Sequence, residues 1–176
     1  MSDTESDRWE LHRQISPGAL QLEATDLENL LPISREKLLL DRVLSLRPGT
    51  HAVAEKAVSA GPKEQQFRGR QEFSFPSTVA FSALEQLSLV VLFSALPEGQ
   101  SIQMPALVSI ESLEISAEMV EPGLLHLHVI SLGQADGFDG DDRVVRFMGR
   151  VTVNGEDFVK ATWAMNTTGE KKKGKP

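Results

Sequence analysis

The stretch PSTVAFSALEQLSLVVLFSA, residues 76–95, decides the fold of this chain. Proline suits the first position of a helix, because its missing N–H would have no partner there. Apolar side chains then surround most of the helical cylinder, and Pro97 and Gly99 stop the run. A helix that is apolar on nearly every side is a buried helix. The sequence therefore predicts one long helix in the centre of the fold.

The residues after this helix have the pattern of β-strands. Residues 125–132 alternate between apolar side chains and the two histidines His126 and His128, as a half-buried strand does. The runs 144–153 and 158–165 flank Asn154-Gly155, and an Asn-Gly pair between two such runs is the strongest short-range signal of a hairpin. A looser alternation predicts a further strand over residues 108–120.

A short helix and two strands are expected before the long helix. Thr25 or Asp26 has a side-chain oxygen that can cap a helix starting there. The apolar run 38–46 closes in a turn at Pro48-Gly49, and residues 51–59 alternate weakly, as a strand does. A single helix laid on an antiparallel sheet is an α+β layer architecture.

Length and charge set further limits. The 176 residues correspond to about one domain, and we expect a polar N-terminal extension (1–25), a folded body (26–166) and a basic flexible tail (167–176). The net charge of −7 argues against broad nucleic-acid binding. The absence of cysteine excludes disulfides and thiolate metal sites. With no secretory signal and no apolar run long enough to span a bilayer, a cytoplasmic protein without membrane contact is expected.

Several segments resemble, in the same order, the β-hydroxyacyl-acyl-carrier-protein dehydratases. LPISREKLLLDRV at 31–43 aligns without a gap with that family's L-P-H-R-Y-P-F-L-L-V-D-R-V. FRGR at 67–70 is similar to F-x-G-H, and PSTVAFSALEQ at 76–86 is similar to P-G-V-L-I-V-E-A-L-A-Q. VEPG at 120–123 is similar to V-x-P-G, and RFMGRVTVNG at 146–155 to K-F-K-G-R-A-T-V-D-G. The resemblance covers residues 26–166, and its collinearity is more specific than any one motif.

The resemblance implies the hot-dog fold, in which a curved antiparallel sheet wraps around one long central helix. It also implies dimers or trimers of dimers, acyl carrier protein or acyl-CoA as partner, and no cofactor. Each site in such a dimer is built from both subunits. The chain is therefore expected to form a homodimer, or a heterodimer with a catalytic hot-dog subunit.

The two catalytic positions of the family are substituted in this chain. In the family, a histidine takes the α-proton of a 3-hydroxyacyl thioester, and a carboxylate on the central helix handles the leaving hydroxyl. The histidine position reads Arg70 here, or Arg68 in an ungapped count, and the carboxylate position reads Ser82. A guanidinium stays protonated and cannot act as the base, and a serine hydroxyl is far too weak an acid to replace a carboxyl. The family chemistry is therefore not expected.

One carboxylate on the helix is a candidate replacement. Glu85 lies three residues after Ser82, so both point to similar sides of a helix, and partial desolvation there would raise the pKa of this carboxyl as a general acid requires. The alternative is that Glu85 pairs with Arg42 or Arg70, or lies at a wet end of the helix. The resemblance further implies substrate contacts from six residues: Phe67, Gly69, Pro76, Ser77, Thr78 and Gln86.

No metal site is expected. His126 and His128 share one strand face at a spacing that can present two ligands, but a third ligand is not evident, and an exposed polar face explains both. His51 and His12 are expected at the surface. Arg143, Arg146 and Arg150 alternate with apolar residues. They form either a basic rim that steers an acidic carrier protein or one solvated strand face.

These observations predict a dehydratase-like protein of fatty-acid or polyketide-type acyl metabolism. We expect it to lack standard 3-hydroxyacyl-carrier-protein dehydratase (lyase) activity, and either to bind acyl thioesters or to partner a catalytic subunit. The alternative is an active 3-hydroxyacyl-thioester dehydratase or thioesterase that uses Glu85.

Overall fold

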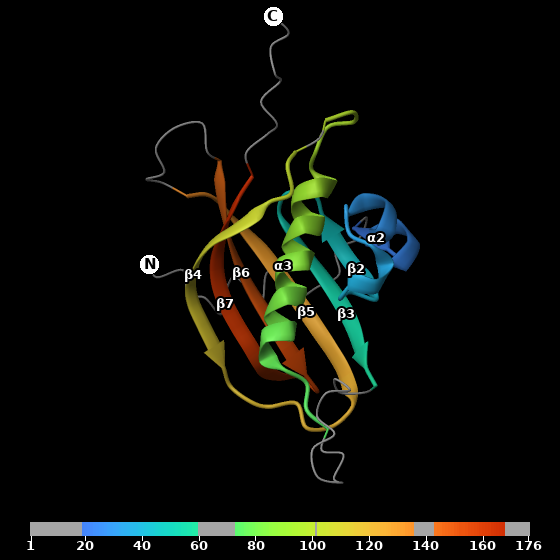
Figure 1. Ribbon diagram of the computed structural model, residues 1–176, viewed down its shortest axis with the longest axis vertical. Coiled ribbons are helices and arrows are strands. Elements are labelled where there is room, and N and C mark those ends of the chain that lie inside the picture. Colours follow the sequence, from blue (N-terminus) through green and yellow to red (C-terminus); the bar gives the residue numbers. More distant parts are fainter. Residues whose placement is uncertain (1–18, 60–72, 101, 136–142, 168–176) are drawn as a thin grey trace, which may run out of the picture.

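One seven-stranded antiparallel sheet curves around one long helix in the described part of the chain (Figure 1). The computed structural model describes residues 19–59, 73–100, 102–135 and 143–167. The strands are β1 (Leu20–Leu22), β2 (Arg42–Arg47), β3 (His51–Val58), β4 (Ala106–Ile115), β5 (Gly123–Gln134), β6 (Val144–Val153) and β7 (Glu156–Asn166). The helices are α2 (Ala24–Leu30), the short 3-10 helix η1 (Arg35–Lys37) and α3 (Ser77–Ser94). The sheet order is β1-β2-β3-β5-β6-β7-β4, so β4 follows α3 in sequence but lies at the far edge of the sheet.

The central helix α3 confirms the prediction for residues 76–95. Pro76 is the N-cap residue rather than the first helical residue, and α3 begins at Ser77. The N–H of Gly49, in the turn between β2 and β3, donates to the carbonyl of Val91 at 3.0 Å and ties the helix to the sheet. By length and composition α3 passes the test for a membrane span, but half of it is buried inside the fold, as expected of a core helix.

The two faces of the sheet have different roles. Alternate side chains of the central strands pack under α3, among them Leu125 and Leu127 of β5, Phe147 of β6 and Trp163 of β7. The Trp163 ring lies edge-on to Phe81 of α3, with centroids 5.6 Å apart, and is stacked near Phe147 at 5.9 Å. Because side chains alternate along a strand, the residues between these point to the outer face, away from α3.

The predicted hairpin is confirmed. Asn154 and Gly155 both have positive φ, at 53° and 83°, which is the backbone of a type I′ turn joining β6 to β7. The strand predicted at 108–120 is β4, which begins two residues earlier and ends at Ile115. Beyond it, Met119 forms an isolated bridge to Phe75.

The N-terminal part of the fold differs in detail from the sequence expectation. The residue that caps α2 is Glu23 and not Thr25 or Asp26, because Asp26 at the third helical position accepts a hydrogen bond from the Glu23 N–H at 2.9 Å. β1 pairs with β2, so residues 20–25 of the predicted extension dock on the domain. Residues 1–18, most of the 133–142 loop and all but Thr167 of the predicted tail lie outside the described residues.

Strand β4 leaves the apolar side of the sheet uncovered. Its residues Leu107, Ile110 and Leu113 lie opposite Met165, Trp163 and Ala161 of the core, and side chains directly opposite share one face. They therefore project on the α3 side, yet they are 39% to 45% exposed. In Figure 1, β4 lies at the edge of the sheet, to one side of α3. The core face of the sheet thus extends beyond the surface that α3 covers.

Candidate functional site

The candidate site lies on α3, where three polar side chains follow one line of the helix. Thr78, Ser82 and Glu85 are spaced four and three residues apart, so they lie on neighbouring turns of one side. Thr78 is exposed, and Ser82 and Glu85 are partly buried. The helix thus brings Ser82, the residue predicted at the dehydratases' carboxylate position, next to Glu85, the only carboxylate that α3 carries.

Glu85 is partly desolvated and unpaired. Burial raises the pKa of its carboxyl above the ordinary value of 4.5, because removal from water disfavours the charged form. Among the described residues, no cation or hydrogen-bond donor contacts this carboxylate. Of the two predicted partners of Glu85, Arg70 lies outside the described residues. The predicted pairing with the other, Arg42, is wrong, because Arg42 donates to Glu55 instead, from Nε at 2.8 Å and from its terminal nitrogen at 2.7 Å.

Gln86, the next residue on α3, is used by the fold. Its amide oxygen accepts from the Leu39 N–H at 2.8 Å, and its amide nitrogen donates to the Lys37 carbonyl at 2.7 Å. Both functional atoms of the side chain therefore hold the segment between η1 and β2 against the helix. Gln86 follows Glu85 in the sequence, but its side chain is bonded to the backbone of Lys37 and Leu39.

The remaining candidate residues lie at or before the start of α3. Pro76 caps the helix and Ser77 opens it, next to Phe75, whose N–H donates to the Met119 carbonyl at 3.1 Å. Phe67, Gly69 and Arg70 lie outside the described residues.

A polar atom that the sequence reading missed lies under α3. Trp163 is completely buried, and its indole Nε1 has no hydrogen-bond partner among the described residues. A buried N–H without an acceptor is uncommon, because its desolvation is not compensated. The tryptophan contacts Phe81, which is one helical turn before Glu85. The sequence could not predict this unsatisfied N–H, because it depends on which acceptors lie near the indole in the folded chain.

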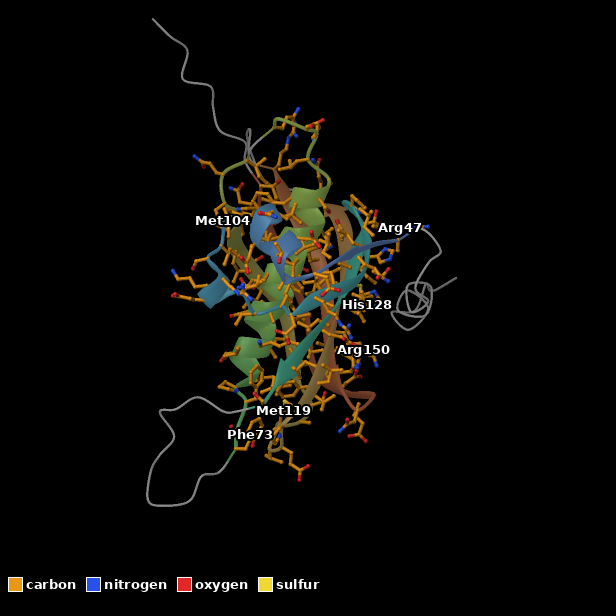
Figure 2. All side chains as sticks on the ribbon, turned by 90° about the vertical axis from the view of Figure 1, so that its right-hand side faces the viewer. Arg47, Phe73, Met104, Met119, His128 and Arg150 are labelled. Carbon is orange, nitrogen blue, oxygen red and sulfur yellow. The ribbon has the colours of Figure 1, made fainter. Side chains whose placement is uncertain are left out.

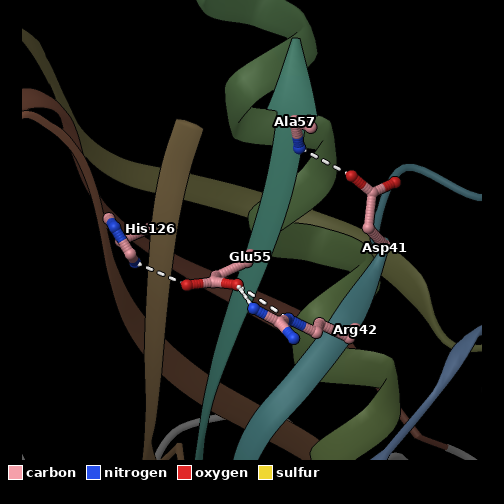
Figure 3. Close-up of polar contacts among 5 residues, drawn as sticks. All are labelled: Asp41, Arg42, Glu55, Ala57 and His126. Carbon is pink, nitrogen blue, oxygen red and sulfur yellow. Dashed lines mark hydrogen bonds and ion pairs between the residues drawn. The ribbon is translucent and has the colours of Figure 1, made fainter. Parts of the chain in front are cut away.

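A row of ionisable residues crosses the outer face of the sheet (Figure 3). Arg42 of β2, Glu55 of β3 and His126 of β5 are register neighbours, and His126 Nδ1 lies 3.5 Å from Glu55 Oε1. His126 and His128 share this face, as predicted. His51 was expected at the surface but is only 2% exposed, because it opens β3 in the middle of the sheet and its ring packs against that of His128. No group of three metal-ligating side chains occurs in the described ranges.

The arginines of β6 are paired on the outer face. Arg146 forms a bidentate ion pair with Glu111 of β4, across the intervening strand β7. Arg150 donates through Nε to Asp157 of β7, which also accepts from Lys160 at 3.0 Å. Neither arginine lies on the α3 side of the sheet, so they do not line the helix face that carries Glu85.

This architecture, one long helix enclosed by a curved antiparallel sheet, is the hot-dog fold. No family model matches the chain, and no curated protein matches it. Solved structures of the same fold do. The dehydratase heterocomplex ApeI:P from Xenorhabdus doucetiae aligns with a TM-score of 0.57 at 14% identity, over 83% of this chain and 91% of that one.

Two other solved structures are similar over most of their length. Cj0977, a sigma28-regulated virulence protein from Campylobacter jejuni, aligns with a TM-score of 0.55 at 13% identity, covering 84% of this chain and 90% of that one. A hypothetical thioesterase from Streptococcus pneumoniae TIGR4, solved with coenzyme A, aligns with a TM-score of 0.52 at 16% identity, covering 73% and 86%. At these identities the similarity establishes the fold.

Proposed function

We propose that this chain binds acyl thioesters as a subunit of a hot-dog dimer and does not carry out standard dehydration of 3-hydroxyacyl thioesters. The observation that supports the proposal is the central helix, which carries Ser82 at the position that the sequence resemblance assigns to the dehydratases' carboxylate. With Arg70, or Arg68 in an ungapped count, expected at the histidine position, neither proton transfer of the dehydration has a suitable group.

The fold and its structural neighbours support the proposed substrate class. The Streptococcus protein was solved with coenzyme A, and the Xenorhabdus structure is a dehydratase heterocomplex. Both support a thioester carried by coenzyme A or by an acyl carrier protein as the ligand of this chain. A role in fatty-acid or polyketide-type acyl metabolism in the cytoplasm fits such ligands.

The partner is a second hot-dog subunit docked along β4. Among the described strands this one has a single neighbour, β7, and its apolar side chains Leu107, Ile110 and Leu113 are exposed on the core face. Exposed apolar surface beside a free strand edge favours association. A second copy would make a homodimer, and a related catalytic chain would make a heterodimer in which this subunit shapes the acyl site.

A second function is favoured by the environment of Glu85. Its carboxylate is unpaired among the described residues, and its pKa is raised by burial, as a general acid near neutral pH requires. Glu85 would then act as acid or base in dehydration, or direct water to the carbonyl carbon in thioester hydrolysis.

A mass-resolved turnover assay tests both functions. The purified protein is incubated with 3-hydroxyacyl, enoyl and saturated acyl thioesters, alongside Glu85→Gln and the control Glu98→Gln, which removes an exposed carboxylate beyond α3. Binding of a saturated acyl-CoA is measured in parallel. A double variant, Arg70→His with Ser82→Glu, restores both family residues.

The proposal predicts binding without turnover, and dehydration by the double variant. Turnover by the parent that is lost in Glu85→Gln and kept in Glu98→Gln would instead establish the second function. A protein that neither binds nor converts any thioester, alone or with a hot-dog partner, would overturn both.

A further inference from the structure

A groove of about 270 Å³ lies on the outer face of the sheet, opposite α3. We name it the outer-face groove, and it is lined by side chains of β3, β5 and β6 and by the turn after β6. Figure 2 shows its residues His128 and Arg150 on the side of the sheet away from the helix. The residues that line it are Val53, His126, Leu127, His128, Arg150, Thr152 and Gly155.

The groove residues form two adjacent rows across the sheet. In one row, His126 lies between Glu55 and Thr152, and in the other, His128 lies between Val53 and Arg150. Because opposite residues in an antiparallel pair have their Cβ atoms about 5 Å apart, four polar side chains converge on one small area, beside the apolar wall of Val53.

The charged groups around the groove are paired or bonded within the chain. Glu55 is engaged by Arg42, and Asp157 by Arg150 and Lys160. Asp41 accepts a hydrogen bond from the Ala57 N–H at 2.6 Å. The three cations are therefore balanced by three acids, and a ligand in the groove is recognised by the individual donors that remain rather than by an excess of local charge.

Several hydrogen-bond donors in the groove have no acceptor among the described residues and can bind a ligand. Arg150 uses Nε for Asp157, and its two terminal nitrogens have no acceptor among the described residues. The Thr152 hydroxyl also has no hydrogen-bond acceptor within the described ranges. His126 faces Glu55 through Nδ1, so its other ring nitrogen is turned to a different side. Guanidinium and hydroxyl groups are donors to anionic oxygens, and a phosphate group offers three strong acceptor oxygens to donors that stand at neighbouring positions of the sheet.

We propose that the outer-face groove binds the phosphate group of a small phosphomonoester, with the apolar part of the ligand against Val53. This site lies on the face opposite Glu85, so it is independent of the proposed thioester function.

The test is a ¹H–¹⁵N NMR titration with phenyl phosphate, and in separate arms with inorganic phosphate and benzoate. Arg150→Gln removes the terminal donors, and its matched control is Arg146→Gln, an ion-paired arginine on the same strand and the same face. Thr152→Val and Arg150→Lys provide second variants if Arg150→Gln does not fold.

Phenyl phosphate is expected to shift the amide signals of His126, His128 and Thr152. Arg150→Gln should weaken its binding about tenfold or more, since hydrogen bonds to charged groups are the strong ones, and Arg146→Gln should leave it within about twofold. Inorganic phosphate should bind the same residues more weakly. The proposal is overturned by absent shifts at millimolar phenyl phosphate, by equal loss in both arginine variants, or by Arg150-dependent binding of benzoate that exceeds that of phenyl phosphate.

Discussion

Gly149 of β6 lies directly beneath the indole of Trp163 on β7. A Cβ added at position 149 would come within 2.6 Å of Cη2 and 2.7 Å of Cζ3 of that ring. Gly149 and Ala161 are register neighbours on adjacent strands, so small residues make room for the tryptophan on the core face. The glycine of the segment FMGR is therefore a packing residue, needed for space and not for a special backbone angle.

The Gly149→Ala variant is expected to lose about 1–3 kcal/mol of unfolding free energy, because the indole is held between α3 and the sheet and cannot move aside. Chemical denaturation measures this loss. Gly123→Ala is the control, since its Cβ would meet the flexible end of Met119 at 3.2 Å and Val153 at an ordinary contact distance of 4.0 Å. Equal stability of the two variants would show that the Trp163 ring repacks freely.

The Glu85→Gln variant is expected to be more stable than the parent at neutral pH, by up to about 1 kcal/mol for a half-buried group screened by solvent. The folded-state pKa is raised, so the ionised carboxylate costs stability above that pKa. The difference should vanish as the pH falls below 4.5. Denaturation curves between acid and neutral pH measure it.

Glu111→Gln is the matched control for that experiment. The hydrogen bond from Arg146 lowers the pKa of the Glu111 carboxyl against the opposing effect of burial, so this carboxylate stabilises the fold above its ordinary pKa and stops doing so as the pH falls through the lowered value. Its removal should cost about 0.2–1 kcal/mol at neutral pH. A loss of similar size in Glu85→Gln would mean that Glu85 has an ion-pair partner outside the described residues.

The Gln86→Ala variant is expected to lose about 1–3 kcal/mol, because it leaves the Leu39 N–H and the Lys37 carbonyl without their side-chain partner. Gln103→Ala, at an exposed position, should be near neutral. If the unfolding free energy hardly changes while acyl-thioester affinity falls, Gln86 contacts substrate as the family resemblance implies.

The Leu113→Lys variant is expected to weaken dimer formation by about tenfold or more, since it places a charge in the exposed apolar side of β4. Chromatography with light scattering over a dilution series measures the dissociation constant. Val120→Lys changes an apolar side chain that is 60% exposed but lies outside the strands, and it should leave association unchanged. Equal dimerisation of both variants would exclude β4 as the interface.

The local elements of this fold were predictable because their causes are local. The apolar cylinder at 76–95 and the Asn154-Gly155 turn act within a few residues, and both were located correctly. The boundaries of β2 and β4 and the cap of α2 were less accurate. They depend on pairing partners and on a reciprocal hydrogen bond between Glu23 and Asp26.

The candidate site was only partly predictable, for the same reason. Helical spacing sufficed to place Ser82 and Glu85 on one side of α3. It could not show that Arg42 binds Glu55 in the neighbouring strand, which leaves Glu85 without that partner. Nor could it show that Gln86 is bonded to the segment after η1.

The sequence by itself determined that this chain builds a buried helix on an antiparallel sheet. The resemblance to the dehydratases assigns Ser82, and Arg70 or Arg68, to the two positions where those proteins have catalytic groups, and that assignment stays a prediction. Only the tertiary structure decided which charged side chains form ion pairs, that the apolar side chains of β4 are exposed, and that His51 is buried. Those outcomes depend on strand order and register, which bring together residues such as Glu111 and Arg146, 35 positions apart, and no local pattern encodes them.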